Sequence, residues 1–402
     1  MSGMATPQDS TVVPADSTAE TVVLGDEARP GSPQRSASGR YALEEEVGRG
    51  GMGRVLRVRD QVLLREVALK VVQGERPEDA QRFESEARIT GQLDHPHVLP
   101  VYDLGHDLEG KPFFTMKLVR GHQSLAEVID RLRAGDPAAV RHFTYERRVQ
   151  VIQAVCHALR YAHERGVIHR DVKPQNVVLG ACGEVYLVDW GVAHVQAGAR
   201  AAGVRAAGAR AAEADAGGGE PIEVDPGQAV ANPGEVTGTP AYMAPEQLLE
   251  GETDELSDVY SLAATLYELL TLNYYLGHVE DGLIALGLAL RDRVPAPPEG
   301  FSDPVHGRVP RTLSRICEKG LAKARGQRFQ SALELEEALQ RWIEGSAPIV
   351  CAGTCMQRVF SRWSYLIDQR PFLVPMVSLL VGALVVGLAL SSLTRTLRLL
   401  LS

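Results

Sequence analysis

The sequence has no excess of basic residues. Its 402 residues contain 42 Lys and Arg against 51 Asp and Glu, a formal net charge of −9, and the basic residues occur mostly singly or in pairs. A protein whose main task is to bind nucleic acid usually carries a basic patch or stripe. The composition therefore argues against a nucleic-acid partner. At 45% apolar and 23% charged, the chain can bury one large core or two of medium size.

Cysteine is also scarce. The cysteines are odd in number, are scattered along the chain and follow no secretion signal: Cys156, Cys182, Cys317, Cys351 and Cys355. We expect reduced thiols in a cytosolic domain and no disulfide framework. Cys351 and Cys355 lie four residues apart, but two ligands without a second pair are weak support for a metal or redox site.

Two segments lack apolar periodicity. Residues 1–39 are rich in Ser, Thr, Pro and acidic residues, and residues 194–235 hold Ala, Gly and Arg repeats before a Pro-containing acidic stretch. Both compositions are typical of disorder. Thr11 and Thr21 lie in a repeated Thr-Val-Val pattern with acidic residues before it. This pattern suits either a solvated tail or two phosphoacceptors that a phosphothreonine-binding partner would recognise.

Residues 371–394 contain no charged side chain. As a helix they would extend about 36 Å, enough to cross a hydrocarbon core of about 30 Å. We therefore expect a single-pass transmembrane helix in the cell membrane, preceded by a juxtamembrane linker (346–370) and followed by a short tail (395–402), with the larger domain in the cytoplasm. Three small residues recur every fourth position in this span, a spacing that suits packing of a homodimer: Ala383, Gly387 and Ser391.

Residues 169–176 read His-Arg-Asp-Val-Lys-Pro-Gln-Asn, and Asp189-Trp190-Gly191 follows thirteen residues later. Phosphoryl transfer needs a carboxylate that orients the attacking hydroxyl, a cation near the transferred group and oxygen ligands for Mg²⁺. Asp171 can accept the hydroxyl proton, and Lys173 can contact the γ-phosphate. Asn176 and Asp189 can ligate the metal. Small-molecule phosphotransferases share this pattern, so the segment alone leaves the acceptor open.

The segment resembles the catalytic loop and metal-binding motif of protein kinases, with Trp190 where the family usually has Phe. Further motifs of the family occur in its usual order: the glycine-rich loop 47–55, the strand motif 67–70, the string 237–246, Asp258 and Arg328. The resemblance implies an α+β, two-lobed protein kinase fold over residues 40–345. The small, mainly β N-lobe would span 40–119 and the larger, mainly α C-lobe 120–345, with the disordered segment 194–235 as an insertion in the activation segment.

The resemblance also implies a nucleotide site for ATP with Mg²⁺, or with Mn²⁺ as the alternative. Lys70 would bind the α and β phosphates and pair with Glu86, which the helical spacing of residues 77–93 also places on the apolar face. The loop over the phosphates would be formed by Val47, Gly48, Arg49, Gly50, Gly51, Met52 and Gly53. The adenine would contact Val55, Ala68, Met116 and Val178, with Lys117, Leu118 and Val119 as the hinge. The ribose contact would fall to Gln123 or Ser124.

Residues 237–246 resemble the end of the activation segment in serine/threonine kinases. In that family the residue matching Thr239 bridges the catalytic Asp and Lys, here Asp171 and Lys173. An Arg at position 170 commonly accompanies activation by a phosphate on this segment. Thr237 is the first hydroxyl-bearing residue after Asp189 and is therefore our candidate phosphoacceptor, with activation without phosphorylation as the alternative.

Other positions have scaffold roles in the family. Glu246 would be buried against Arg328, and Asp258 would bind the backbone of the catalytic loop. His169 would pack against the residue at position 190. Here Trp190 is larger than the usual Phe and Thr90 is smaller than the usual aliphatic residue, and we hypothesise that the two changes offset each other in volume.

These observations predict a membrane-anchored serine/threonine kinase of the bacterial type. It would phosphorylate proteins, including itself, in signal transduction. One rival is a pseudokinase that serves as a membrane-tethered scaffold, which the changes at positions 190 and 90 favour and the filled catalytic positions disfavour. A small-molecule phosphotransferase is the other rival, although residues 239–246 and Asp258 match a platform for protein substrates.

Overall fold

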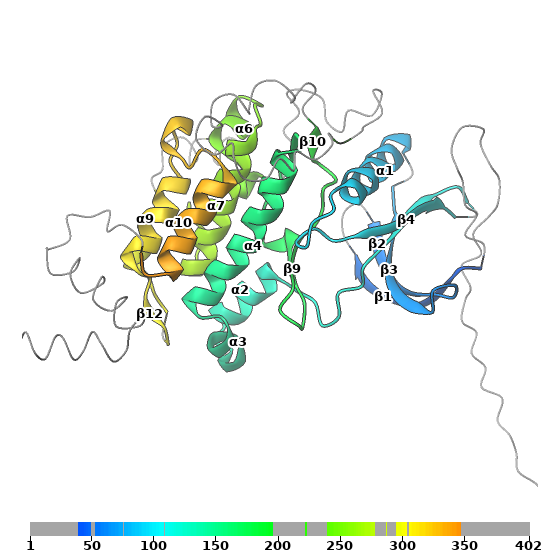
Figure 1. Ribbon diagram of the computed structural model, residues 1–402, viewed down its shortest axis with the longest axis horizontal. Coiled ribbons are helices and arrows are strands. Elements are labelled where there is room, and N and C mark those ends of the chain that lie inside the picture. The colour runs from blue at the N-terminus through cyan, green and yellow to red at the C-terminus, as the bar shows by residue number, and fades with distance from the viewer. Residues whose placement is uncertain are drawn as a thin grey trace, which may run out of the picture. The chain divides into compact units, whose positions relative to one another are not determined.

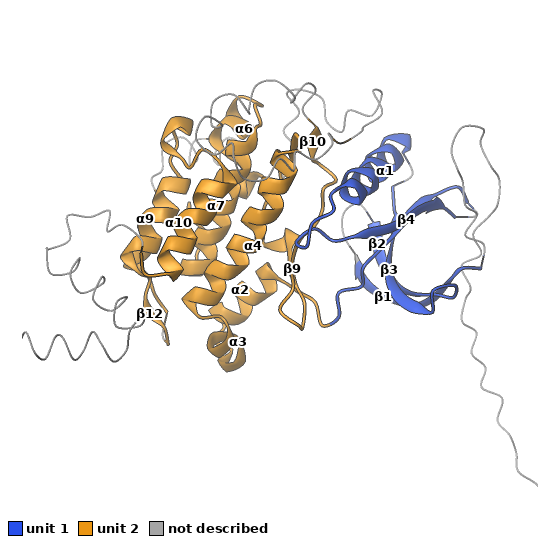
Figure 2. Cartoon of the chain, viewed as in Figure 1, with its two compact units in different colours: residues 1–120, 223–230 blue, residues 121–222, 231–402 orange. Residues whose placement is uncertain are grey.

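The computed structural model describes residues 39–49, 53–74, 76–107, 109–195, 222, 239–277, 287, 295–303 and 305–346. The chain divides into unit 1 (residues 1–120 with 223–230) and unit 2 (residues 121–222 with 231–402), as Figure 2 shows. The division after Arg120 lies one residue from the predicted lobe boundary. Within the described ranges, no helix combines the length and apolar character needed to span a membrane. The predicted span 371–394, residues 1–38 of the predicted tail, Cys351 and Cys355 lie outside those ranges.

Unit 1 is built on an antiparallel sheet of five strands in the order β1-β2-β3-β5-β4 (Figure 1). Its elements are β1 (Tyr41–Arg49), β2 (Gly53–Asp60), β3 (Arg65–Val72), α1 (Pro77–Gln92), β4 (Val101–His106) and β5 (Pro112–Met116). The strand motif 67–70 lies within β3, and the predicted helix 77–93 is α1. Pro77 occupies the first turn of α1, where its missing N–H leaves no intrahelical bond unmade.

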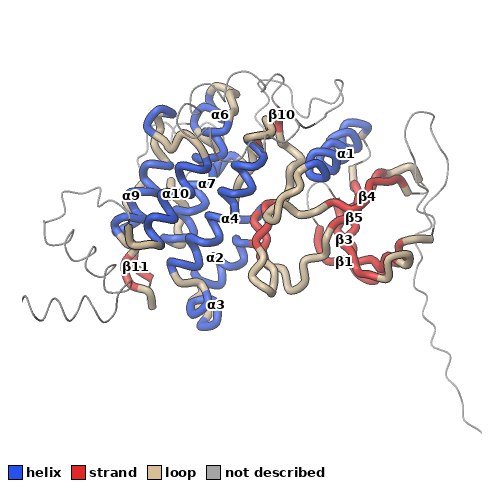
Figure 3. The backbone as a smooth tube through the Cα atoms, in the orientation of Figure 1, coloured by secondary structure: helices blue, strands red, loops and turns tan. Residues whose placement is uncertain are grey.

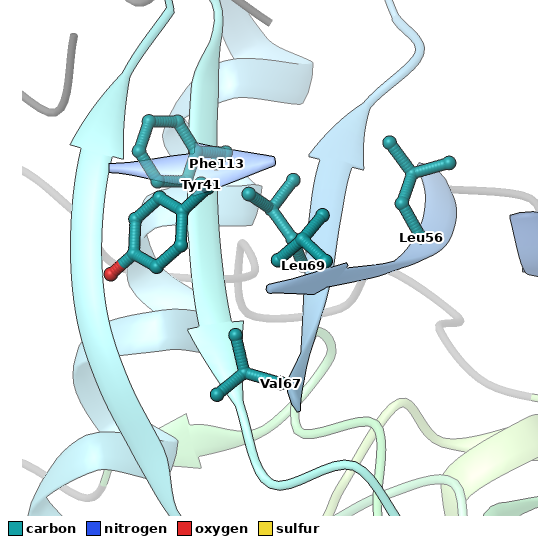
Figure 4. Close-up of a cluster of buried hydrophobic side chains, with 6 residues drawn as sticks. Tyr41, Leu56, Val67, Leu69 and Phe113 are labelled. Carbon is teal, nitrogen blue, oxygen red and sulfur yellow. The ribbon is translucent and has the colours of Figure 1, made fainter. Parts of the chain in front are cut away.

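The two faces of strand β3 have different neighbours because successive side chains of a strand point to opposite sides. On one face, Val67 and Leu69 join a buried cluster with Tyr41, Leu56, Val58 and Phe113 (Figure 4). On the other face, Val72 packs with Phe83 and Ala87 of α1. Lys70 has the same strand parity as Val72, so its side chain emerges on the face that α1 covers. The strand register thus directs Lys70 towards Glu86.

Unit 2 is mainly helical, and Figure 3 shows its few short strands in red among blue helices. Its helices are α2 (Leu125–Arg133), α3 (Pro137–His142), α4 (Tyr145–His163), α6 (Pro245–Leu249), α7 (Glu255–Thr271), α9 (Arg311–Gly320) and α10 (Ala332–Ile343). Its strands are β6 (Gln123–Ser124), β7 (Val167–Ile168), β8 (Val177–Leu179), β9 (Val185–Leu187), β10 (His194–Val195), β11 (Ser302–Asp303) and β12 (Gly307–Arg308). Short 3₁₀ turns are η1 (Pro174–Asn176), η2 (Pro240–Tyr242), η3 (Pro298–Gly300) and η4 (Arg325–Gln327).

Helix α4 forms the centre of unit 2 and contacts α7 and α10. Val149, Ile152, Val155 and Leu159 are fully buried, as their helical spacing predicts. Sequence reasoning missed α2 and α3. Helix α2 has a capping box, in which Ser124 Oγ accepts the N–H of Glu127 and the Glu127 carboxylate accepts the N–H of Ser124.

Strand β10 corrects the predicted start of the disordered insertion. His194 and Val195 pair with Ile168 and Val167 of β7, so the predicted boundary at residue 194 is at least two residues too early. Ile222, which also lies within the predicted insertion 194–235, is buried. Two residues are too few to show the alternation of a strand, so only the pairing with β7 identifies β10 as a strand.

A buried ion pair attaches the β11–β12 hairpin to α4. The Arg148 guanidinium contacts the Asp303 carboxylate at 2.6 Å and donates to the carbonyl groups of Phe143 and Leu269. Burial on its own would raise the pKa of Asp303. The N–H of Val305, the Arg148 guanidinium and a further backbone N–H outweigh burial and lower that pKa. No sequence motif predicted this ion pair.

Candidate active site

The catalytic loop leaves β7 at Ile168 and returns through η1 to β8. Asp258 of α7 holds its start, because the two carboxylate oxygens accept the backbone N–H groups of His169 and Arg170, each at 2.8 Å. Burial would raise the pKa of Asp258, but the hydrogen bond from His163 and the nearby His169 lower it. The predicted contact of Asp258 with the loop backbone is therefore present.

Asp171 lies at the centre of a group of short contacts. Its Oδ2 accepts a hydrogen bond from Lys173 Nζ at 2.6 Å, and its Oδ1 accepts the backbone N–H of Thr239 at 2.6 Å. Lys173 Nζ also donates to Thr239 Oγ1 at 2.5 Å. Thr239 thus bridges the Asp and the Lys, as the kinase resemblance implies. A carboxylate held by donors on both oxygens is oriented towards a third group from which it can accept a proton.

Asn176 adds a further contact to this group and keeps an oxygen for a metal. Its Nδ2 donates to the carbonyl oxygen of Asp171 at 2.8 Å and to Oδ2 of the same residue at 3.1 Å. Since both bonds use the nitrogen, Oδ1 remains as a hard oxygen ligand. The hairpin β8–β9 brings the second predicted ligand near, because Val188 N–H donates to the carbonyl of Asn176 at 2.9 Å and Asp189 follows directly.

The donor set fits Mg²⁺ in chemical type. Magnesium is usually held by one or two protein oxygen ligands together with waters and substrate phosphates, and Asn176 with Asp189 offers this number. Asp189 has a left-handed backbone with φ of 67°, which is uncommon for a non-glycine residue and typical of functional turns. Among the described residues, no cluster of three or more His, Cys, Asp or Glu side chains suits a metal.

Trp190 is fully buried and packs edge-on against His169, with ring centroids 4.6 Å apart and an interplanar angle of 62°. His169 in turn makes a contact of 3.1 Å between Nε2 and the carbonyl of Val188. The predicted packing of His169 on position 190 is thus present. Trp190 Nε1 is buried and finds no acceptor within the described part of the chain. The indole is therefore held by packing.

Unit 1 contains the predicted ion pair. Lys70 Nζ lies 2.6 Å from Glu86 Oε1, and both side chains are largely buried. Glu84, two residues earlier on α1, instead contacts Arg88 and His106. The helical spacing therefore identified the correct glutamate.

The glycine-rich loop is described in part. Val47 and Gly48 belong to β1, and Arg49 ends that strand, whereas Gly50, Gly51 and Met52 lie outside the described residues. Gly53 opens β2 where it approaches β3 closely, because a Cβ built there would collide with the carbonyl oxygen of Val71. Val55 pairs with Lys70 across the two strands.

The predicted adenine and hinge residues lie on separate units. In unit 1, Ala68 pairs with Met116 at the end of β5, and Val119 is buried. The N–H of Lys117 donates to the carbonyl of Pro100 at 3.1 Å, so this N–H is already used within unit 1. In unit 2, Val178 pairs with Tyr186 in the β8–β9 hairpin and is partly exposed.

The two candidates for the ribose contact have other tasks. Gln123 Oε1 accepts a hydrogen bond from Arg131 at 2.9 Å. Ser124 caps α2, as its bond with Glu127 shows. The capping pattern Ser-x-x-Glu was present in the sequence and could have predicted this cap, whereas the ribose contact stays a prediction.

The segment after Thr239 is anchored by a second buried ion pair. Glu246 of α6 receives both arms of the Arg328 guanidinium, at 2.6 and 2.7 Å, as predicted. Burial would raise the pKa of Glu246, but the hydrogen bonds from Arg328 lower it. Gln247, the next residue, was not predicted to matter. Its side chain is buried and its Nε2 donates to the carbonyl of Arg170 at 2.9 Å.

Of the predicted phosphoacceptors, Thr11, Thr21 and Thr237 lie outside the described residues. Arg170 is buried in the catalytic loop. His194 of β10 lies near enough for charge effects, since burial and the positive charge of Arg170 both lower the pKa of His194.

Comparison with known proteins agrees with this geometry. Residues 41–342 match the protein kinase domain family. The serine/threonine-protein kinase PknD of Chlamydia trachomatis serovar D is 32% identical over 343 residues, covering 81% of this chain and 34% of that protein. PknD of Protochlamydia amoebophila is 30% identical over 336 residues, covering 81% of this chain and 32% of that protein. The chain thus spans about a third of the length of these relatives.

Among solved structures, the kinase domain of Mycobacterium tuberculosis PknI aligns with 75% of this chain and 95% of its own length, at 25% sequence identity and a TM-score of 0.48. The family match covers the β-sheet unit, the helical unit and the catalytic loop that joins β7 to β8. This chain belongs to the protein kinase family, and the curated relatives that it resembles are serine/threonine-protein kinases.

Proposed function

We propose that this chain is a membrane-anchored protein serine/threonine kinase that transfers the γ-phosphate of Mg-ATP to Ser and Thr hydroxyls of proteins, including its own. The observation that carries the proposal is the contact group around Asp171. One carboxylate is held by a lysine and by the backbone of Thr239, and that lysine also binds the Thr239 hydroxyl. A scaffold that only binds nucleotide has no need for such an oriented carboxylate.

Each residue has a defined task in the proposed reaction. Asp171 orients the acceptor hydroxyl and takes its proton while the oxygen attacks phosphorus and the bond to the β-phosphate oxygen breaks. Lys173 stabilises the charge on the transferred phosphoryl group. Bound Mg²⁺, for which Mn²⁺ is an alternative, supplies positive charge to the phosphate oxygens when held by Asn176 and Asp189.

The nucleotide-binding roles rest on the family resemblance. Lys70, oriented by Glu86, contacts the α and β phosphates, and residues 47–53 cover them. Ala68, Met116 and Val178 with Val55 contact the adenine. Because the Lys117 N–H is bound to Pro100, the hinge contacts with adenine use the Lys117 carbonyl and the groups of Val119.

Specificity for Ser and Thr is supported by residues 239–246. Lys173 together with Thr239 is the combination found in serine/threonine kinases, and the curated relatives carry that name. Thr237 is the proposed regulatory phosphoacceptor. The presence of Arg170 supports this role, because an Arg at that position commonly accompanies activation by a phosphate on this segment. Thr11 and Thr21 are proposed acceptors for a phosphothreonine-binding partner.

Membrane anchoring is supported by the uncharged stretch 371–394, which is long enough to span a bilayer. It would place the kinase domain at the cytoplasmic face of the cell membrane, where ATP is available, with a role in signal transduction. Packing of Ala383, Gly387 and Ser391 would favour a homodimer.

The test uses the purified full chain with Mg²⁺ and labelled ATP, in parallel with Asp171→Asn. The wild type should label itself or a generic protein substrate on Ser and Thr. The variant should lose at least about 100-fold in rate, because it lacks the proton acceptor. Equal labelling of both proteins, or of neither, would favour a pseudokinase scaffold. Label transferred only to a small molecule would favour a small-molecule phosphotransferase.

A further inference from the structure

We propose that Gln247 is a positioning residue for phosphoryl transfer, because it holds the peptide unit that joins Arg170 to Asp171. The inference rests on the proposed kinase activity and adds a residue to it. Gln247 is 2% exposed on α6, and its Nε2 donates to the carbonyl oxygen of Arg170 at 2.9 Å.

The backbone at Arg170 needs such support. Its φ is 69°, in the left-handed region that strains a non-glycine residue. Asp258 holds the N–H of Arg170, and Gln247 holds its carbonyl. The strained residue is therefore fixed at both its peptide bonds.

The held carbonyl belongs to the same rigid peptide plane as the N–H of Asp171, which contacts His169 Nδ1 at 3.3 Å. Rotation of that plane would turn the Asp171 side chain away from Lys173. The amide of Gln247 thus acts on the carboxylate through the backbone, without touching the reacting atoms.

Gln247 also connects the loop to the anchored end of the activation segment. It follows Glu246, whose carboxylate is fixed by Arg328. Eight residues earlier, the Thr239 N–H binds the Asp171 carboxylate directly. Residues 239–247 therefore hold the catalytic loop at two points, Asp171 and Arg170. The orientation of Asp171 thus depends on correct folding of the proposed protein-substrate platform.

The first test replaces Gln247 by Met, which has a similar length and no donor, in the full-length protein. Gln153→Met is the matched control, because Gln153 is also buried and its Nε2 donates to Gln340 at 2.9 Å, between α4 and α10. We expect Gln247→Met to lower kcat about 10-fold, with the KM for ATP changed less than about twofold. Gln153→Met should leave kcat unchanged.

Two further measurements separate positioning from general destabilisation. Amide hydrogen exchange of residues 169–173 should become faster in Gln247→Met and not in Gln153→Met. When Arg170 is also replaced by Gly, Gln247→Met should accelerate the hydrogen exchange of residues 169–173 less, because glycine adopts the left-handed backbone without strain. Gln247→Glu should lose kcat at pH 8 and regain part of it near pH 6, where a protonated carboxyl can donate to the carbonyl.

Unchanged kcat and exchange in Gln247→Met, or an equal loss of kcat in Gln153→Met, would overturn the proposal. If Gln247→Met does not fold, Gln247→Glu decides the question, and a flat pH response of that variant counts against positioning. If the wild type transfers no phosphate, the proposed function fails, whereas the exchange comparison still decides whether Gln247 holds the loop.

Discussion

Glu246 and Arg328 form a buried two-pronged ion pair between residues 82 positions apart, with side chains 4% and 0% exposed. The guanidinium also donates to the carbonyl groups of Ala322, Lys323 and Leu256. All the N–H donors of this cation are therefore satisfied inside the protein. The pair fastens the end of the activation segment to the C-terminal helices of unit 2.

Arg328→Ala should destabilise the protein by about 3–5 kcal/mol, because it leaves the Glu246 carboxylate buried without its partner. Urea unfolding of the full chain measures the change. The matched control is Arg341→Ala, which removes an exposed arginine 3.8 Å from Glu337 and should cost less than about 1 kcal/mol. An equal decrease in the free energy of unfolding in the two variants would contradict the claim that burial of the Glu246–Arg328 pair determines its effect.

The stabilisation from Asp303 should depend on pH. Its pKa in the folded protein lies below the unfolded value of about 4, so its contribution is complete above about pH 4 and is lost as pH falls towards the lowered pKa. Asp303→Asn should therefore cost about 3–5 kcal/mol at pH 7, and the gap to the wild type should narrow below about pH 4.

Urea unfolding of both proteins at a series of pH values checks this. Asp130→Asn is the control, since Asp130 pairs with Arg133 on the surface and should change stability by less than about 1 kcal/mol at pH 7. A gap between wild type and Asp303→Asn that stays constant down to pH 3 would argue against the ionised pair.

Thr239→Val should lower kcat about 10- to 100-fold. Valine has nearly the shape of threonine and keeps the backbone N–H that binds Asp171, but it removes the hydroxyl that Lys173 contacts. Thr239→Ser retains the hydroxyl and should stay within about threefold of the wild type. Steady-state phosphorylation kinetics provide the comparison, and a Val variant as active as the Ser variant would rule out a role for the hydroxyl.

Trp190→Phe should lower kcat by about 3- to 10-fold, because the smaller ring leaves space beside His169. The indole N–H has no acceptor among the described residues, so the loss should come from packing and not from a broken hydrogen bond. Trp342→Phe on α10 controls for the substitution itself. Unchanged activity of Trp190→Phe would count against the hypothesis that the bulk at position 190 offsets the smaller Thr90.

Local signals predicted much of this protein. The kinase motifs predicted the two lobes, and helical spacing predicted α1 and placed Glu86 on the face that meets Lys70. Two features were missed for local reasons. The spacing of Ser124 to Glu127 indicates a helix cap that was not predicted, and the two residues of β10 were too few to show a strand period.

By itself the sequence determined which chemical groups are available and in what order, because a catalytic loop places Asp171, Lys173 and Asn176 within six residues of each other. Only the tertiary structure decided which distant groups hold them. Gln247 reaches Arg170 from 77 residues away, and Arg148 meets Asp303 across 155. Periodicity specifies the face of a helix or strand and not the element that faces it, so such partners follow from packing of the folded chain.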